Sequence, residues 1–202
     1  MKKKTIFIIL FVSVFTLVGC GGASSITTEK DDSYDKKVQR VFVIGIIEDQ
    51  LRRSVFYQPV PIGYNMIRAF NANVVEATIR VTSPESYSLI DYAKEAELFA
   101  SDAIMQIDMN PFYSTRDDRN QAIVGHVFEA SLIDMGTQKK VWHATGKVKY
   151  SKKIWLADGK VKYSEKDLQL LSSGAEMATA GAIVSAFITE VNGQKFVFWL
   201  PK

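Results

Sequence analysis

The order of apolar and polar positions predicts strands and helices that alternate over the first half of the chain. Residues 41–47 are continuously apolar and rich in β-branched side chains, which is typical of a buried strand. Pro59 and Pro61 are tolerated in a first helical turn, and the apolar positions from there to Phe70 predict a short amphipathic helix. Residues 74–81 alternate between apolar and polar and predict a second strand.

A second helix and a third strand are expected next. Ser83 and Pro84 have the pattern of an N-cap followed by proline at the first helical position, and apolar residues at helical spacing continue to Phe99. Residues 103–109 predict a strand. The charged segment 111–121 predicts a solvent-exposed loop between strands.

The following segment predicts a β-hairpin. Residues 122–134 and 139–150 have the pattern of two long strands, and the turn residues at 135–138 join them. A further turn at 157–159 precedes a short candidate strand at 160–163. Two antiparallel strands are therefore expected in this region.

The last element is predicted to be helical. Residues 164–191 carry apolar positions at steps of three and four, and one side of this helix is built from glycine and alanine. Such a smooth side suits either close packing in the core or a contact with a second copy of the chain. Residues 196–200 are apolar and are a candidate edge strand.

These elements define the expected fold class. Their order is β-α-β-α-β-β-β-α, and two strand–helix–strand crossovers imply parallel pairing. The later hairpin is antiparallel, so the sheet is mixed. We therefore expect an α/β (α+β) fold in which residues 38–202 form one domain, with a single mixed sheet and helices packed on it.

The N-terminus has the pattern of a bacterial lipoprotein signal peptide over residues 1–19. Three lysines precede the apolar run 6–18, which is too short, at about 1.5 Å per residue, to cross a hydrocarbon core of roughly 30 Å. The lipobox Leu17-Val18-Gly19 ends at Cys20, the single cysteine. It predicts attachment of a diacylglycerol to this thiol, cleavage before it, and acylation, typically with palmitate, of the new N-terminus. The alternatives are an ordinary signal peptide with an unmodified cysteine, or an uncleaved segment whose cysteine is buried.

Lipidation would make Cys20 the membrane contact of the protein. Residues 20–37 are polar and include a glycine-rich start, so they are expected to form a flexible tether between membrane and domain. No aspartate follows the cysteine, which by lipoprotein sorting rules favours the periplasmic face of the outer membrane over the inner membrane.

Charge excludes one class of partner. The chain has 25 Lys and Arg against 22 Asp and Glu, and the excess of three equals the three lysines of the leader. The remaining chain is balanced and carries no excess charge for nucleic acid.

Candidate catalytic and metal-binding residues are few. His126 and His143 are the two histidines, and a hairpin turning at 136–137 would set His126 opposite Lys147 and His143 opposite Ala130. The two rings would then lie roughly 13 Å apart, too far to share an ion. The chain lacks the glycine-rich phosphate-binding and nucleophile motifs, so we expect no metal and no cofactor.

Four carboxylates near strand ends are the candidates for an alternative enzymatic role. Glu48, Asp49, Asp102 and Asp108 could supply acid–base chemistry if the fold brought them together. The simpler interpretation places the adjacent pair Glu48 and Asp49 in an exposed turn.

One motif resembles a known group of proteins. Within residues 128–144 two apolar residues precede Asp134, followed by Thr137, Lys139 and the pair Val141-Trp142. This pattern resembles small bacterial lipoproteins and a domain shared by the curli-secretion lipoprotein, the penicillin-binding-protein activators and the amino-terminal domain of the Tol propeller protein. The resemblance implies this element order over most of 38–191, and it carries over no catalytic residue. Trp142 is expected either to pack on the sheet or to contact a partner.

The leading hypothesis is therefore a lipid-anchored binding or assembly protein of the periplasm that contacts another envelope protein. The alternatives are an envelope hydrolase with a carboxylate site and a component of an oligomeric export assembly, and self-association into a homo-oligomer is expected for the last.

Overall fold

The computed structural model describes residues 25–47, 61–117, 120–157, 160–161 and 179–197. Within them seven strands form one sheet, in the spatial order β1-β6-β5-β4-β2-β3, with β7 paired to β6. The strands, in chain order, are β1 (Ser25–Lys30), β2 (Arg40–Ile47), β3 (Glu76–Thr82), β4 (Ala103–Asp117), β5 (Asn120–Asp134), β6 (Lys140–Ala157) and β7 (Lys160–Val161).

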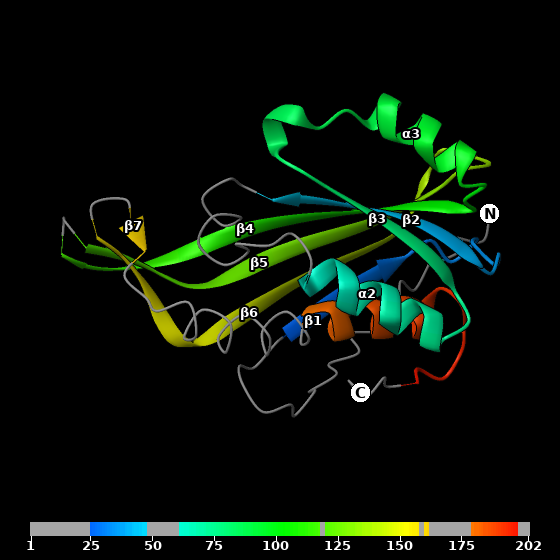
Figure 1. Cartoon of the computed structure of the whole chain (residues 1–202). Coiled ribbons are helices and arrows are strands. Elements are labelled where there is room, and N and C mark those ends of the chain that lie inside the picture. Colours follow the sequence, from blue (N-terminus) through cyan, green and yellow to red (C-terminus); the bar gives the residue numbers. More distant parts are fainter. Residues whose placement is uncertain (1–24, 48–60, 118–119, 158–159, 162–178, 198–202) are drawn as a thin grey trace, which may run out of the picture.

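The helices lie on both faces of this sheet (Figure 1). Helix α2 (Pro61–Ala72) and the C-terminal helix, described over residues 179–190, cover one face. The short 3₁₀ helix η1 (Pro84–Ser86) and helix α3 (Leu89–Leu98) lie on the other. Strand β2 is parallel to β3 and β4, whereas β4, β5, β6 and β1 pair antiparallel. The expected α/β class with a single mixed sheet is confirmed.

Strand β2 is apolar from Val41 to Ile47 because both of its faces are buried there. Val41, Val43 and Ile47 belong to the larger core under α2 and the C-terminal helix. Phe42 and Ile44 belong to a smaller core under α3. A central strand covered on both sides shows a continuous apolar run rather than an alternating one.

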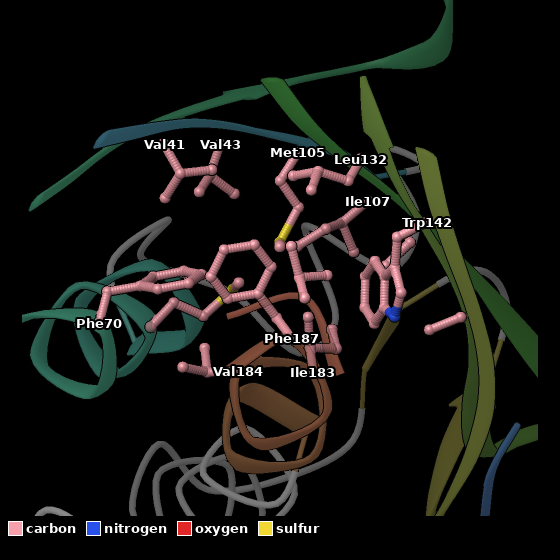
Figure 2. Close-up of a cluster of buried hydrophobic side chains, with 14 of the residues drawn as sticks. Val41, Val43, Phe70, Met105, Ile107, Leu132, Trp142, Ile183, Val184 and Phe187 are labelled. Atoms are coloured by element: carbon pink, nitrogen blue, oxygen red, sulfur yellow. The ribbon is translucent and has the colours of Figure 1, made fainter. Parts of the chain in front are cut away.

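The larger core contains three aromatic side chains that meet in two edge-to-face contacts. Phe187 of the C-terminal helix packs against Phe70 of α2 at a ring distance of 5.5 Å and against Trp142 of β6 at 6.3 Å. Figure 2 shows Phe187 between the two helices and the sheet, with Met105 and Leu132 above it. The aromatic contacts therefore join both helices to the middle of the sheet.

The structure corrects the expected start of the folded domain. The tether predicted over 20–37 is wrong from Ser25 onward, because residues 25–30 form β1 and pair with β6. Tyr34, within the same segment, is only 8% exposed. Pairing with β6 satisfies the backbone hydrogen-bonding groups of this polar segment. Amino-acid composition alone does not reveal such pairing.

The loop expected at 111–121 is also wrong. Strand β4 continues to Asp117 and β5 begins at Asn120, so the pairing runs far beyond the expected strand end. Backbone pairing between the two strands therefore extends through this charged segment.

The start of the second helix differs as well. Ser83 and Pro84 begin the 3₁₀ turn η1, and helix α3 has its own N-cap, Ser88, whose hydroxyl accepts a hydrogen bond from the Asp91 N–H at 3.4 Å. Phe196 and Val197 lie outside any strand, and the remainder of the expected edge strand lies outside the described residues.

Candidate functional site

One part of the sheet has no helix over it among the described elements. Helix α3 covers β2 and the beginning of β4, but the same face continues across the rest of β4, β5, β6 and β1. The residues that the strand register places on this uncovered area, called the open face below, are Thr27, Glu29, Asp108, Asn110, Val127, Glu129, Ser131, His143, Thr145 and Lys147.

The register brings two carboxylates together on the open face. Asp108 of β4 pairs directly with Glu129 of β5. The Asp108 carboxylate accepts a hydrogen bond from the Gln106 amide at 3.0 Å, and the Gln106 carbonyl accepts one from the Tyr87 hydroxyl at 2.8 Å. Partial burial, reinforced by the negative charge of Glu129, raises the pKa of Asp108 above its ordinary value.

A shallow groove lies beside this carboxylate pair. It has a volume of about 340 Å³ and is lined by Thr27, Asn110, Val127, Phe128, Glu129, Thr145, Gly146 and Lys147. Its lining combines hydroxyl groups, one carboxylate, one ammonium group and the exposed side chain of Val127. A surface of this composition can bind a polar segment with an apolar side chain.

His143 lies next to the groove, but its contacts do not form a catalytic relay. Its Nδ1 is 3.3 Å from the Ser131 hydroxyl and 3.7 Å from the Glu129 carboxylate. A nucleophile and an orienting carboxylate must bind different ring nitrogens if a proton is to pass from one side of the imidazole to the other. Here both contacts fall on the same nitrogen, so the arrangement provides polar binding groups.

The histidine register predicted from the turn is wrong by one residue. His143 faces Ser131 and His126 faces Val148. Because side chains alternate between faces, this shift places the two imidazoles on opposite sides of the sheet. His126 is buried under the C-terminal helix, where its Nε2 is 3.0 Å from the Thr179 hydroxyl, and burial lowers the pKa of His126 to about 4.

The carboxylates proposed for an enzyme do not converge. Asp102 accepts hydrogen bonds from the backbone N–H groups of Gln39 and Arg40, at 2.8 and 2.9 Å, and so holds the beginning of β2. Asp108 lies six residues further along β4, roughly 20 Å away at strand spacing. Glu48 and Asp49 lie outside the described residues. Among the residues that the structure describes, no group of three or more His, Cys, Asp and Glu side chains is placed to hold a metal ion.

Trp142 is a core residue, so its suggested role as a partner contact is wrong. Its side chain is 1% exposed, and its indole N–H donates to the Glu190 carboxylate at 3.0 Å. The rest of the motif forms the hairpin turn. The Asp134 carboxylate accepts hydrogen bonds from the N–H and hydroxyl of Thr137, both at 2.8 Å, and pairs with Lys36 at 3.2 Å.

Asp108 is one of the carboxylates that the sequence predicts as a candidate, whereas Glu129 is not, and only the strand register brings the two together. The available signal was the alternation that leaves polar residues at 129 and 131 and at 143, 145 and 147, which marks one solvated face on each strand. The lipobox Leu17-Val18-Gly19 and Cys20 lie outside the described residues. Within the described part of the chain, no helix has the length and apolar character needed to span a membrane.

The comparisons with known proteins return similar structures only. No family model matches the chain, and no curated protein matches it in sequence. The chain is similar to the PelC dodecamer from Paraburkholderia phytofirmans, with a TM-score of 0.37 and 16% identity over 77% of this chain and 94% of that one. It is similar to lipoprotein GNA1162 from Neisseria meningitidis, with a TM-score of 0.35 and 14% identity over 71% and 96%.

A third similar structure is TolB from Acinetobacter baumannii, with a TM-score of 0.33 and 8% identity over 83% of this chain and 31% of that one. A bacterial lipoprotein and a Tol protein, two kinds named in the resemblance of the hairpin motif, are thus among the structural neighbours.

Proposed function

We propose that the chain is a lipid-anchored protein of the bacterial envelope that binds another envelope protein through the open face. The anchor is Cys20, supported by the lipobox before it. The absence of aspartate after Cys20 supports the periplasmic face of the outer membrane as its location.

The observation that carries the binding role is the pair of Asp108 and Glu129. Like charges directly opposite each other on neighbouring strands destabilise a sheet. Partial burial is the largest cause of the raised pKa of Asp108, and the negative charge of Glu129 raises it further. A lysine or arginine from a partner, placed between the two carboxylates, would remove the repulsion and form charge-assisted hydrogen bonds. The partner is therefore expected to present a basic residue to this part of the sheet.

The groove supplies the rest of the contact. Val127 is 39% exposed at its wall and offers an apolar surface, while Thr27 and Thr145 offer hydroxyl groups. The polar network from Tyr87 through Gln106 holds the Asp108 carboxylate in place before a partner arrives. Such preorganisation reduces the entropy lost on binding.

The test is site-specific crosslinking in intact cells. A photoreactive amino acid at Val127 should give a discrete crosslinked band that contains a second envelope protein. The double variant Asp108→Asn/Glu129→Gln should reduce this band at least tenfold, because the basic residue of the partner loses both of its acceptor charges.

The matched control changes the same number of charges elsewhere. Asp91→Asn/Glu97→Gln alters two exposed carboxylates of α3 and should leave the band unchanged. Equal band intensity in both double variants would reject the open face as the binding site. A band that contains only a second copy of this chain would assign the open face to self-assembly.

A further inference from the structure

The strand that follows the expected anchor begins at the base of a long extension of the sheet. Ser25, the first residue of β1, pairs with Lys147 of β6. Beyond this point β4, β5 and β6 run on together past the described helices, and β7 pairs near their far end (Figure 1). We call residues 111–117, 120–125, 148–157 and 160–161 the arm.

The direction of β1 places its first residue, Ser25, at the base of the arm. Strand β1 runs antiparallel to β6, from Ser25 opposite Lys147 to Lys30 opposite Trp142. Its beginning therefore points to the end of the sheet from which the arm extends, and its end points to the opposite side.

The segment that connects the lipid anchor at Cys20 to the sheet is short. Cys20 precedes Ser25 by five residues, and a residue spans at most about 3.6 Å, so the Cα atoms of Cys20 and Ser25 are at most about 18 Å apart. Strand β6 alone extends the arm by residues 148–157, or roughly 33 Å. The segment from Cys20 to Ser25 is thus shorter than the arm. A lipid on Cys20 would therefore keep the base of the arm close to the bilayer.

The outer strand of the arm is basic, although the mature chain as a whole is balanced. Between residues 147 and 161 the only acidic residue is Asp158. Four lysines of this stretch lie in the arm, Lys149, Lys152, Lys153 and Lys160, and Lys147 lies at its base. Among the residues that the structure describes, 148–155 have no strand partner on the side of β6 that faces away from β5, so this basic stretch is an edge of the described sheet.

These observations fit a lipid surface. Each lysine close to an anionic membrane adds attraction of about 1 kcal/mol, and Tyr and Trp, present here as Tyr150 and Trp155, are enriched at membrane interfaces. We infer that the lysine-rich edge of the arm binds the anionic headgroups of the membrane that holds the Cys20 anchor. This inference rests on the proposed lipidation of Cys20. It makes the arm a second, electrostatic membrane contact and leaves the other end of the sheet directed away from the bilayer.

The experiment uses the full acylated protein in vesicles of phosphatidylcholine and phosphatidylglycerol at 7:3 that contain a lipid-borne quencher. Because Cys20 carries the lipid, Ser151→Cys in the arm and Asp32→Cys beyond the far end of β1 each provide one free thiol for a fluorophore. The label at position 151 should be quenched at least twofold more than the label at position 32. Equal quenching would overturn the inference.

Charge reversal distinguishes the contribution of the arm to membrane binding from that of the anchor. Lys152→Glu/Lys153→Glu should abolish the quenching difference, whereas Lys139→Glu/Lys140→Glu, with the same change of charge at the β5–β6 turn, should preserve it. A difference that survives in Lys152→Glu/Lys153→Glu, or that is equally large in vesicles of phosphatidylcholine alone, would overturn the electrostatic contact.

Flotation of the vesicles tests the anchor independently. All variants should float, because the acyl chains remain. Flotation together with equal quenching would overturn the arm contact alone, whereas failure to float would reject the anchor and with it the inference.

Discussion

Phe128 and Gly146 show how one residue depends on its neighbour across the sheet. The two residues pair directly between β5 and β6, and the ring of Phe128 lies over the position that a Cβ of Gly146 would occupy. Gly146 is therefore required by packing rather than by backbone conformation.

At this scale we predict that Gly146→Ala destabilises the fold by about 1–3 kcal/mol, because the added methyl group overlaps the buried ring and displaces it. Denaturant unfolding measures the change. The control is Gly45→Ala in β2, where the nearest atoms to an added Cβ are 3.8 Å away and no such overlap occurs. Equal losses for the two variants would contradict this explanation.

The C-terminal helix is held on the sheet by hydrogen bonds from its last residues. Asn192, just after this helix, exchanges two hydrogen bonds of 2.9 Å with the backbone of Val38. Glu190 accepts from Thr28 at 2.6 Å and from Trp142 at 3.0 Å, so it connects the helix to β1 and β6. Residues 179–184 are buried, which assigns the small side chains in this stretch to the core and not to contact with a second copy. The helix is thus fixed to the sheet by both packing and hydrogen bonds.

His126 makes this docking sensitive to pH. Its pKa is about 4 in the folded state and about 6.5 in the unfolded state. Between these values the unfolded chain binds more protons, so the contribution of His126 is complete above pH 6.5 and is lost as the pH falls towards 4. The difference corresponds to a loss of roughly 3 kcal/mol of unfolding free energy at pH 4.

The expected result is a flatter pH dependence in His126→Gln. The unfolding free energy of the wild type minus that of this variant should decrease by roughly 3 kcal/mol between pH 7 and pH 4. Parallel pH curves for wild type and His126→Gln would show that burial of this ring does not cause the dependence.

At the scale of the whole molecule, β1 connects the segment that follows Cys20 to the sheet. Its pairing with β6 means that a lipid on Cys20 would position the domain and not merely retain it. The open face and the basic arm lie one after the other along strands β5 and β6 of the same sheet. A membrane contact that fixes the orientation of the arm would therefore also fix the orientation of the open face.

We predict that Cys20→Ala abolishes incorporation of radiolabelled palmitate, because the chain contains no other thiol for the thioether. The variant should retain the melting temperature of the wild type, since the change lies before β1. Ser24→Ala, a small substitution on the other side of the segment from Cys20 to Ser25, should incorporate label normally. Label that persists in Cys20→Ala would reject the lipoprotein assignment.

Local patterns were sufficient for the features that neighbouring residues decide. The continuous apolar run of β2, the helical spacing of α2 and the turn between β5 and β6 each depend on side chains close in sequence, and all three are present. The lipobox is likewise a contiguous signal. From these elements the mixed α/β class could be predicted, because crossovers and hairpins constrain strand direction.

Tertiary structure alone decided what depends on distant pairing. Strand β1 is polar, and only β6 gives its backbone a partner. The ladder between β4 and β5 extends through a charged segment, and a shift of one residue in the β5–β6 register moves His143 to the open face. The same register sets Asp108 against Glu129, although 21 positions separate them in the sequence. The hydrophobic pattern and the turn limit the register between two strands, but the irregularity between Leu132 and Ile133 shifts the β5–β6 pairing by one residue. A shift of one residue turns every side chain beyond it to the other face, and the assembled sheet decides whether it occurs.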